Sequence, residues 1–393
     1  MKGWGPIRPI NEAMASVLII GGGFGGVMAA ESLARRLDPE HQVTLVSRHS
    51  EFTFFPALVR LAFGRCALED VFYDLEKAML SRRVEFVQAE VFSLDPFSRA
   101  VIALRGGREV RLPYDYLVFA LGRRLAVERV PGLALHAHHL LTVGDALKFR
   151  EAIKSFERGH AVIGYCPDSR LSVPVYETAF ALDRALRERG RRDQAKITII
   201  SPDSPGGLLG GVAIVPALRT ALEKHGIDFI PDFPVDFITP GNVFAKNSRR
   251  VAYDLLMLVP PFQGLYETQF SNITDRQGYV RVDDYMRSTQ AQRFYAAGDA
   301  VSFPGPKMAH MAVLQGEVAA ANIAAEIDGR LPEARYDHEI TLVIDEGGED
   351  SIYLHHEFWE EGETIIRQGR FWGWAKHVHE KYWTRLRSLK PVA

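Results

Sequence analysis

The chain has 393 residues, 47% of them hydrophobic, and a formal net charge of -2. This length and apolar content allow two or three domains with separate cores, and they exclude a disordered or fibrous protein. A charge so close to zero gives no overall attraction to a phosphate backbone, so we expect no nucleic acid among the partners.

The cysteine content and the apolar runs bear on the compartment. Cys66 and Cys166 are too few for a disulfide framework or a cysteine-based metal site, so a reducing compartment is expected. Residues 1–16 lack the long apolar core of a secretory signal, and no run of about 18 apolar residues predicts a membrane span. We therefore expect a cytoplasmic protein.

A glycine-rich turn opens the first predicted unit. Residues 17–20 are apolar and read as a buried strand, which leads into Gly21-x-Gly23-x-x-Gly26 and then into helical spacing over 27–36. Gly21 permits a tight turn, and Gly23 lets the backbone approach a pyrophosphate at the positive end of the helix. Gly26 allows the helix and the strand to pack closely. This context predicts a dinucleotide-binding βαβ unit rather than a purely structural turn.

The second strand of this unit is predicted over 42–46 and ends at Ser47 and Arg48. An acidic residue usually holds the ribose hydroxyls at the position of Ser47. Serine can form the hydrogen bond, but it lacks the charge that strengthens the contact. The motif therefore indicates a dinucleotide without specifying which one.

The rest of the first unit is predicted to mix short elements. The aromatic segment 52–63 is interrupted by Pro56 and reads as too irregular for a core helix. We expect a helix over 70–81 and strands over 84–87, 100–104, 109–112 and 114–122. The last strand ends in Ala120-Leu121-Gly122, a pattern that brings backbone close to a cofactor.

A second α/β unit is predicted from residue 160 onward. Its expected strands are 161–164, 196–200, 228–230 and 255–259, and its expected helices are 176–189 and 215–225. Where a working nucleotide turn would carry three glycines, the chain reads Gly164-Tyr165-Cys166-Pro167-Asp168. Tyr165 and Cys166 place Cβ atoms where a pyrophosphate needs bare backbone, and the charge of Asp168 would repel it by about 1 to 4 kcal/mol at about 4 Å. We interpret this lobe as one without a nicotinamide site.

The chain then returns to the first unit. A strand is predicted over 293–297, followed by Gly298-Asp299-Ala300 and a helix over 307–323. An acidic residue after a buried strand and a glycine can accept a hydrogen bond from a ribityl hydroxyl. We favour this interpretation of Asp299 over a solvated turn aspartate.

The C-terminal part differs in composition from the rest. Residues 340–366 are predicted to form two short strands with a loop at Gly347-Gly348. Apolar residues then recur every three or four positions: Phe371, Ala375, Val378, Tyr382, Leu386 and Leu389. Basic residues accompany them: Lys376, Lys381, Arg385, Arg387 and Lys390. This pattern favours a helix lying at a membrane surface over a terminal helix packed on the protein or at a dimer interface.

Six stretches resemble a known group of flavoproteins: VLIIGGGFGG (17–26), VTLVSRHSEFTFFP (43–56), YDYLVFALG (114–122), VPPFQG (259–264), FYAAGDA (294–300) and PKMAH (306–310). The group is the flavoproteins with two dinucleotide-binding domains, within the pyridine nucleotide-disulfide oxidoreductase superfamily. Within it the chain looks most like sulfide:quinone reductases and flavocytochrome c sulfide dehydrogenases, which are related to type II NADH dehydrogenases.

The resemblance implies an α/β fold with two Rossmann-like domains and a C-terminal membrane-associating segment. The FAD-binding domain would comprise 16–140 and 269–330, the second, degenerate domain 141–268, and the C-terminal strands and helix 331–393. It also implies FAD as the cofactor. The FAD-binding residues carried over are Gly21, Gly23, Phe24, Gly25, Gly26, Ser47, Arg48, Pro56, Glu90, Val91, Ala120, Gly122, Gly298, Asp299 and Lys307.

The resemblance also gives these residues roles. Ser47 would meet the adenosine ribose, Val91 the adenine, and Asp299 the ribityl chain. Lys307 would lie near the pyrimidine edge of the flavin, where a positive charge stabilises the reduced ring. In sulfide:quinone reductases the C-terminal segment is a monotopic anchor that delivers quinone, so Phe371 and Tyr382 would flank the quinone ring, with Lys307 near a quinone oxygen.

One departure from the resemblance concerns the electron donor. Sulfide:quinone reductases use cysteines beside the flavin as nucleophiles, but the matching positions here are Leu141, Leu171 and Leu342. We therefore expect an FAD-dependent oxidoreductase, peripheral on the inner face of the cell membrane, that passes two electrons from an unassigned donor to a quinone without the cysteine mechanism. A type II NADH:quinone oxidoreductase and a non-catalytic flavin-binding scaffold remain alternatives, and a homodimer and covalent FAD attachment are left open.

Overall fold

A five-stranded parallel sheet carries the first unit in the computed structural model, which describes residues 14–209, 211–265, 272–348, 350–359 and 362–383. Its strand order is β19 (Phe294–Ala296), β9 (Tyr116–Phe119), β1 (Ser16–Ile20), β2 (Gln42–Ser47) and β5 (Glu85–Gln88). The chain thus leaves this sheet after β9 and returns to it at β19. The two parts of the first unit therefore share one sheet.

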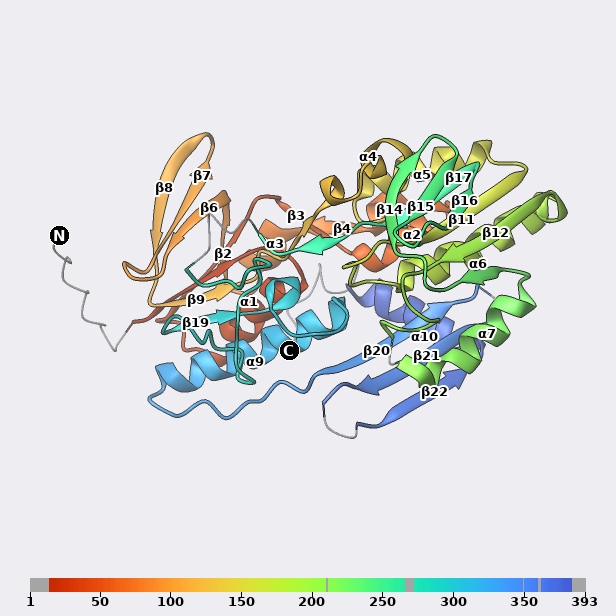
Figure 1. The fold of residues 1–393 in the computed structure, drawn as a ribbon. Coiled ribbons are helices and arrows are strands. Elements are labelled where there is room, and N and C mark those ends of the chain that lie inside the picture. The colour runs from red at the N-terminus through yellow and green to blue at the C-terminus, as the bar shows by residue number, and fades with distance from the viewer. Residues whose placement is uncertain (1–13, 210, 266–271, 349, 360–361, 384–393) are drawn as a thin grey trace.

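Two helices pack against each other beside this sheet (Figure 1). They are α1 (Phe24–Arg36) and α9 (Ala309–Ile327). A Cβ added at Gly316 in α9 would lie 2.4 Å from the carbonyl oxygen of Gly25 in α1. Because no side chain fits there, glycine at this position allows the two helices to approach closely.

Shorter elements complete the first domain. An antiparallel sheet of β6 (Glu90–Asp95), β7 (Ala100–Arg105) and β8 (Arg108–Pro113) projects at the end of the molecule away from the second lobe (Figure 1). The others are β3 (Glu51–Thr53), β4 (Phe72–Asp74), α2 (Leu58–Ala62), α3 (Leu75–Leu80), the 3-10 turns η1 (Phe55–Ala57) and η2 (Leu68–Asp70), and η6 (Gly298–Ala300) after β19.

Two predictions for this region are wrong. The helix expected over 70–81 begins only at Leu75, because residues 72–74 pair with β3 and Tyr73 stacks on Phe52 at 4.8 Å. Residues 58–62, expected to be irregular, form a short helix whose Leu58 and Leu61 are fully buried. In both places, contacts with distant residues outweigh the local pattern.

The second lobe contains a four-stranded parallel sheet of order β13 (Asp228–Ile230), β12 (Ala195–Ile200), β11 (Gly159–Tyr165) and β17 (Leu255–Val259). Its helices are α4 (Leu133–His136), α5 (Val143–Ser155), α6 (Val173–Glu188) and α7 (Val215–Lys224), with η3 (Val127–Arg129), η4 (Arg192–Gln194) and η5 (Gly211–Ile214). Three antiparallel strands, β14 (Val235–Thr239), β15 (Asn242–Ala245) and β16 (Arg250–Ala252), and the pair β10 (Arg124–Leu125) and β18 (Phe262–Gln263) complete it.

The C-terminal part forms a three-stranded antiparallel sheet rather than two strands. It comprises β20 (Glu339–Asp345), β21 (Ser351–Glu357) and β22 (Thr364–Gln368), and α10 (Arg370–Lys381) packs on β20 and β21. Figure 1 shows this sheet beside α6 and α7 of the second lobe.

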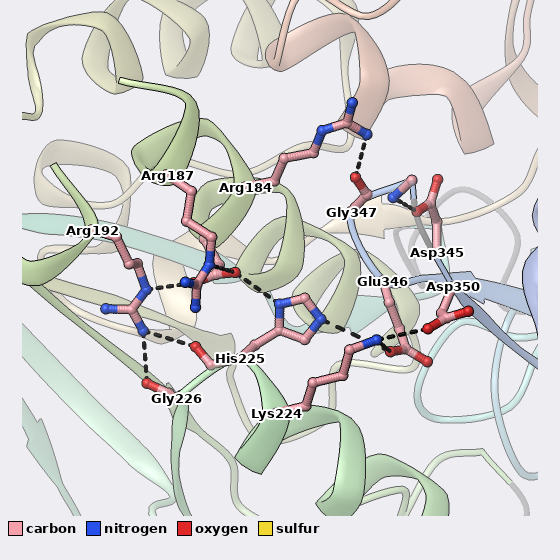
Figure 2. Close-up of polar contacts among 12 residues, drawn as sticks. Arg184, Arg187, Arg192, Lys224, His225, Gly226, Asp345, Glu346, Gly347 and Asp350 are labelled. Atoms are coloured by element: carbon pink, nitrogen blue, oxygen red, sulfur yellow. Dashed lines mark hydrogen bonds and ion pairs between the residues drawn. The ribbon is translucent and has the colours of Figure 1, made fainter. Parts of the chain in front are cut away.

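Charged side chains join the second lobe to the loop between β20 and β21 (Figure 2). His225, just after α7, lies 2.8 Å from a carboxylate oxygen of Asp183 and 3.9 Å from one of Glu346. The adjacent Lys224 pairs with Asp350 at 2.7 Å. This network ties the C-terminal sheet to the second lobe.

Candidate functional site

The glycine turn adopts the geometry expected of a phosphate-binding turn. Gly21 has φ +112° and donates its N–H to the carbonyl oxygen of Val46 at 2.8 Å. A Cβ at Gly26 would lie 1.9 Å from the carbonyl oxygen of Gly21, so any side chain would force the helix away from the strand. A Cβ at Gly21 would lie 2.1 Å from the carbonyl oxygen of Ala120. The turn therefore lies directly against the segment Ala120-Leu121-Gly122 that follows β9.

The two motifs that frame the first domain meet at the start of α1. A Cβ at Gly25 would lie 3.2 Å from the backbone nitrogen of Gly298, whose N–H donates to Gln315 at 2.7 Å. By contrast, a Cβ at Gly23 would meet no atom within 4 Å. The open space at Gly23, at the N-terminus of a thirteen-residue helix, suits a pyrophosphate group. The residues present thus fit a dinucleotide cofactor at this turn.

The predicted ribose and adenine residues follow the next strand. The side chain of Ser47 is buried beside the turn, where a Cβ at Gly22 would lie 2.6 Å from its Oγ. Arg48 forms an exposed ion pair with Glu90 at 3.5 Å, and Val91 is the next residue in β6. Ser47 thus lies beside the glycine turn, and the adjacent Arg48 contacts β6 through Glu90.

Asp299 has a partner that the sequence did not predict. Nε of Arg123 lies 3.0 Å from its carboxylate, and the Arg123 guanidinium lies 3.5 Å from the centre of the Phe262 ring. Burial lowers the pKa of Arg123, and the charge of Asp299 opposes that shift. Arg123 follows Gly122 directly, but nothing in the sequence pattern indicates that its side chain turns inward.

Lys307 is buried close to Asp299 and Gly298. Its Nζ donates to the carbonyl oxygen of Val301 and lies 4.9 Å from the centre of the Tyr279 ring. Burial and the charge of Arg170 hold the pKa of Lys307 well below its ordinary value. A neighbouring anionic group would oppose this shift. Lys307 and Asp299 line the same small cavity of about 10 Å³, which has room for about one water molecule.

A larger hollow of about 290 Å³ lies elsewhere. Its lining includes Arg36, Asn322, Asp328 and Arg330, at the C-terminal end of α9. It contains none of the predicted site residues, so its size alone does not make it the candidate site.

An aromatic cluster covers the start of α1. The Phe24 ring lies 4.9 Å from that of Phe52, 5.7 Å from that of Phe54 and 5.0 Å from that of Trp383. Pro56 follows in η1. Trp383 is only 3% exposed, so the C-terminal part of the chain packs directly against the glycine turn.

The helix α10 turns its apolar side outward. Its exposed apolar residues are spaced three or four positions apart and are Phe371 (62% exposed), Trp374 (63%), Val378 (46%) and Tyr382 (38%), the last directly after the helix. We call these four residues the apolar stripe. The predicted residues Arg385, Leu386, Arg387, Leu389 and Lys390 lie outside the described residues.

The side of α10 that faces the protein is charged. Lys376 pairs with buried Glu177 of α6, and Glu380 pairs with Arg60 of α2. The prediction that Lys376 belongs to the exposed basic side is therefore wrong, because its ammonium group reaches into the protein to meet Glu177. With Lys376 and Glu380 turned inward, α10 exposes the apolar stripe together with the polar residues Arg370, His379 and Lys381.

Lys307, Phe371 and Tyr382 are the three residues expected to surround a quinone, but no interaction between them is seen in the described part of the chain. Among the described residues, no hydrogen bond, ion pair or ring contact joins Lys307 to Phe371 or Tyr382. Phe371 contacts Trp372 and Trp374 instead.

The turn of the second lobe is filled by its own side chains. Tyr165 is buried, and its hydroxyl accepts a hydrogen bond from Ser201 at 2.7 Å. Asp168 pairs with Arg129 at 2.6 Å, so the predicted repulsion of a pyrophosphate is partly neutralised by a cation.

Neither cysteine is an activated nucleophile. Burial raises the pKa of Cys166 to about 12, and burial outweighs the nearby Arg60 to raise the pKa of Cys66 to about 11. The three leucines at the positions of the family's cysteines all pack in the main core, Leu141 and Leu342 buried and Leu171 partly buried. A thiolate is the reactive form of cysteine, and these environments disfavour it.

No helix in the described ranges combines the length and the apolar character needed to cross a bilayer.

A comparison with family models matches residues 15–166 and 208–316 to the pyridine nucleotide-disulphide oxidoreductases. Among curated relatives, the sulfide-quinone reductase of Aquifex aeolicus is 31% identical over 257 residues, which are 63% of this chain and 59% of that protein. The type II NADH:quinone oxidoreductase of Staphylococcus aureus is 24% identical over 81% of this chain and 84% of that protein.

Solved structures give a similar result. The sulfide:quinone oxidoreductase of Aquifex aeolicus superposes with a TM-score of 0.87 at 26% identity, covering 95% of this chain and 92% of that one. NDH2 from Plasmodium falciparum superposes with a TM-score of 0.73 at 14% identity, covering 95% and 96%, which shows the shared fold.

Proposed function

This chain belongs to the pyridine nucleotide-disulphide oxidoreductase family as an FAD-dependent oxidoreductase, and from that premise we propose that it passes two electrons from a soluble donor to a quinone at a membrane surface. Bound FAD would accept electrons on one face of its ring and release them on the other. Gly23 and the start of α1 would hold the pyrophosphate, and Asp299 would meet the ribityl chain. The contact between the glycine turn and Gly298 is the observation that carries this proposal.

The membrane part of the proposal depends on α10. This helix buries Lys376 and Glu380 and exposes Phe371 and Trp374, so its apolar side faces away from the protein, where a membrane surface could contact it. Aromatic residues at the headgroup level are typical of interfacial helices. The relatives named as quinone reductases support a membrane quinone as the acceptor. Two free cysteines suit a reducing compartment, which favours the cytoplasmic face.

The proposed donor is not a sulfur nucleophile captured by a protein thiolate. Leucines replace the family's cysteines, and the pKa values of both remaining thiols are raised to about 11 and about 12. The leucines at these positions pack in the core and supply no nucleophile. We therefore favour a hydride or electron donor, or a docking protein, over a sulfur nucleophile.

Stopped-flow mixing of the purified holoenzyme with sulfide, NADH or NADPH, followed by a soluble quinone analogue, tests the redox proposal. We expect quinone-dependent turnover with a donor other than sulfide, and the Cys66→Ser/Cys166→Ser double variant should retain the full rate. Rapid bleaching of the flavin by sulfide, lost in the double variant, would contradict the proposal. A lack of turnover with every donor and quinone would favour the non-catalytic scaffold.

Vesicle sedimentation tests the membrane proposal separately. Trp374→Glu should lower binding to phosphatidylcholine/phosphatidylglycerol vesicles by at least about tenfold, because it puts a charge in the apolar stripe. Leu135→Glu is the matched control, since Leu135 is 83% exposed on α4, far along the chain from the stripe. Equal binding of both variants and the unmodified protein would exclude the stripe as the membrane contact.

A type II NADH:quinone oxidoreductase is the second candidate. The curated relatives of that kind and the ion pair of Arg129 with Asp168, which reduces the repulsion of a phosphate, favour it. It requires NADH to bind where Tyr165 fills the turn. Saturable flavin reduction by NADH would establish this candidate.

A further inference from the structure

One histidine and two carboxylates cluster on one face of the C-terminal sheet. Glu339 of β20 and His355 and Glu357 of β21 place one ligand atom each within 4.8 Å of one another. Nε2 of His355 lies 3.8 Å from Oε2 of Glu339 and 3.7 Å from Oε1 of Glu357. From this geometry we propose that the three side chains bind a first-row divalent metal ion, with Zn²⁺ as the representative.

Strand register brings the ligands together. Glu339 lies directly opposite Glu357, and His355 lies opposite Thr341. Side chains two residues apart in a strand share a face, so all three ligands project from the same face of the sheet. Like charges directly opposite one another destabilise a strand pair. In the ranges that the structure describes, neither carboxylate pairs with a lysine or an arginine, so a divalent cation would neutralise them.

The distances suit a small cation. Two ligand atoms about 2.0 to 2.1 Å from a tetrahedral zinc ion lie about 3.3 Å from each other. The two separations from His355, 3.7 and 3.8 Å, need only small side-chain movements to reach that value, and the two carboxylate oxygens, which lie within 4.8 Å of each other, need a larger one. One imidazole and two carboxylates also match the ligand preferences of zinc, and a water molecule would take the fourth position.

Each ligand is oriented by a second partner on its other polar atom. Nδ1 of His355 lies 3.0 Å from the hydroxyl of Thr341, which leaves Nε2 to face the carboxylates. Oε2 of Glu357 accepts the backbone N–H of Glu363 at 3.2 Å, which leaves Oε1 toward His355. Oε1 of Glu339 lies 3.2 Å from Nε2 of His310, which leaves Oε2 toward His355. Outer partners of this kind fix ligand orientation at metal sites.

The proposed site would join two parts of the molecule. His310 lies in the first turn of α9, three residues after Lys307, whereas the three ligands belong to the C-terminal sheet. A bound metal would hold Glu339 in place and thereby strengthen the contact between this sheet and the start of α9. We therefore assign the site a stabilising role, separate from electron transfer.

Isothermal titration calorimetry with Zn²⁺ on chelator-treated, FAD-loaded protein tests the proposal. We expect one Zn²⁺ per chain, together with a rise in melting temperature on zinc addition. His355→Ala and Glu339→Gln should each lower the affinity by about 100-fold or more, and His310→Ala by about 10-fold, as expected for an outer partner. His356→Ala is the matched control, because His356 lies on the opposite face of β21 and contacts Thr364 at 2.8 Å.

The outcomes separate the alternatives. Absence of a stoichiometric binding event in the unmodified protein would overturn the proposal, and so would His355→Ala binding zinc as tightly as His356→Ala. The metal-free melting temperature and the FAD content of each variant show whether it has folded. Glu339→Gln keeps the size of the side chain, so loss of binding in that variant at unchanged FAD content would support the site even if His355→Ala folds poorly.

Discussion

Nε of Arg123 lies 3.0 Å from the carboxylate of Asp299, and the two side chains are only 16% and 26% exposed. The pair fixes the orientation of the residue proposed to hold the ribityl chain. It also places a cation beside the candidate flavin site. The Phe262 ring covers the Arg123 guanidinium at 3.5 Å. If either charged side chain is replaced, water therefore has little access to solvate the charge that remains.

Arg123→Met should therefore lower the free energy of unfolding by about 3 kcal/mol, since it leaves a carboxylate in a mostly buried site without its partner. The Arg123→Met/Asp299→Asn double variant should lose less than the sum of the single losses. Urea unfolding measures both. Arg129→Gln is the control, because its pair with Asp168 is about half exposed and should contribute at most about 1 kcal/mol. Additive losses would show that the Arg123–Asp299 pair has no energetic coupling.

Gly316→Ala should disturb the packing of α9 on α1. The added Cβ would lie 2.4 Å from the carbonyl oxygen of Gly25, and overpacking of this kind costs about 1 to 3 kcal/mol. FAD content should fall as well, because Gly25 belongs to the cofactor turn. Gly144→Ala in α5 is the control: its nearest neighbour would be 4.0 Å away, so the helix should gain up to about 1 kcal/mol. Equal stability of the two variants would contradict this account of Gly316.

Asp183 should make the stability of the protein depend on acid pH. Although its burial raises the pKa, hydrogen bonds from His225, Arg187 and Arg192 outweigh this and lower the pKa to about 2. Because the folded-state pKa lies below the ordinary value of 3.8, the stabilisation of about 2 kcal/mol is complete above about pH 4 and is lost as the pH falls toward 2.

Urea unfolding at pH 6, 4 and 3 measures this effect. The unmodified protein should lose stability over that range faster than Asp183→Asn, which has no proton to take up at this position. Asp183→Asn should also be less stable at pH 6, because it weakens the network that joins the second lobe to the C-terminal sheet (Figure 2). Parallel pH profiles for the two proteins would rule out a lowered pKa for Asp183.

The sequence predicted the parts of the fold that depend on local pattern. Strands such as β13 and β17 occur at the predicted residues, and the two glycine motifs singled out in the sequence lie against each other. Distant partners were not predictable in this way. Glu380 is paired with a residue 320 positions earlier in the chain, and a lysine in a helical pattern looks exposed until its partner Glu177 is known.

The same limit applies within the candidate site. Arg123, Gln315 and Gly316 stand in the printed sequence without any motif that marks them. Arg123 is preceded by a predicted cofactor glycine, yet only the fold shows that its side chain turns toward Asp299. The histidine–carboxylate cluster was likewise hidden, because its three ligands come from two strands and converge only through the register of β20 and β21.

Trp383 should determine whether α10 stays in place over the glycine turn. Its ring lies against Phe24 at 5.0 Å and stacks on Phe52 at 5.9 Å, and its indole N–H donates to His379 at 3.0 Å. Trp383→Ala would remove a large buried side chain, a change that costs about 3 to 5 kcal/mol in a protein core. Because Trp383 lies two residues beyond the end of α10, we expect this loss to appear first as undocking of that helix.

Hydrogen exchange of α10 measures the undocking, and FAD titration measures its effect on the turn. Trp383→Ala should speed exchange in residues 370–381 and weaken FAD binding through Phe24, whereas Trp383→Phe should retain most of the packing. Trp374→Ala provides the control, because Trp374 is 63% exposed and its removal should change stability by less than about 0.5 kcal/mol. Trp374 belongs to the apolar stripe, whereas Trp383 belongs to the buried aromatic cluster. Of the two alanine variants, only Trp383→Ala should therefore keep the apolar stripe for vesicle binding while its α10 undocks from the protein. If both variants exchange like the unmodified protein, other contacts hold the helix, namely the ion pairs of Lys376 and Glu380 and the stacking of Trp372 on Tyr353.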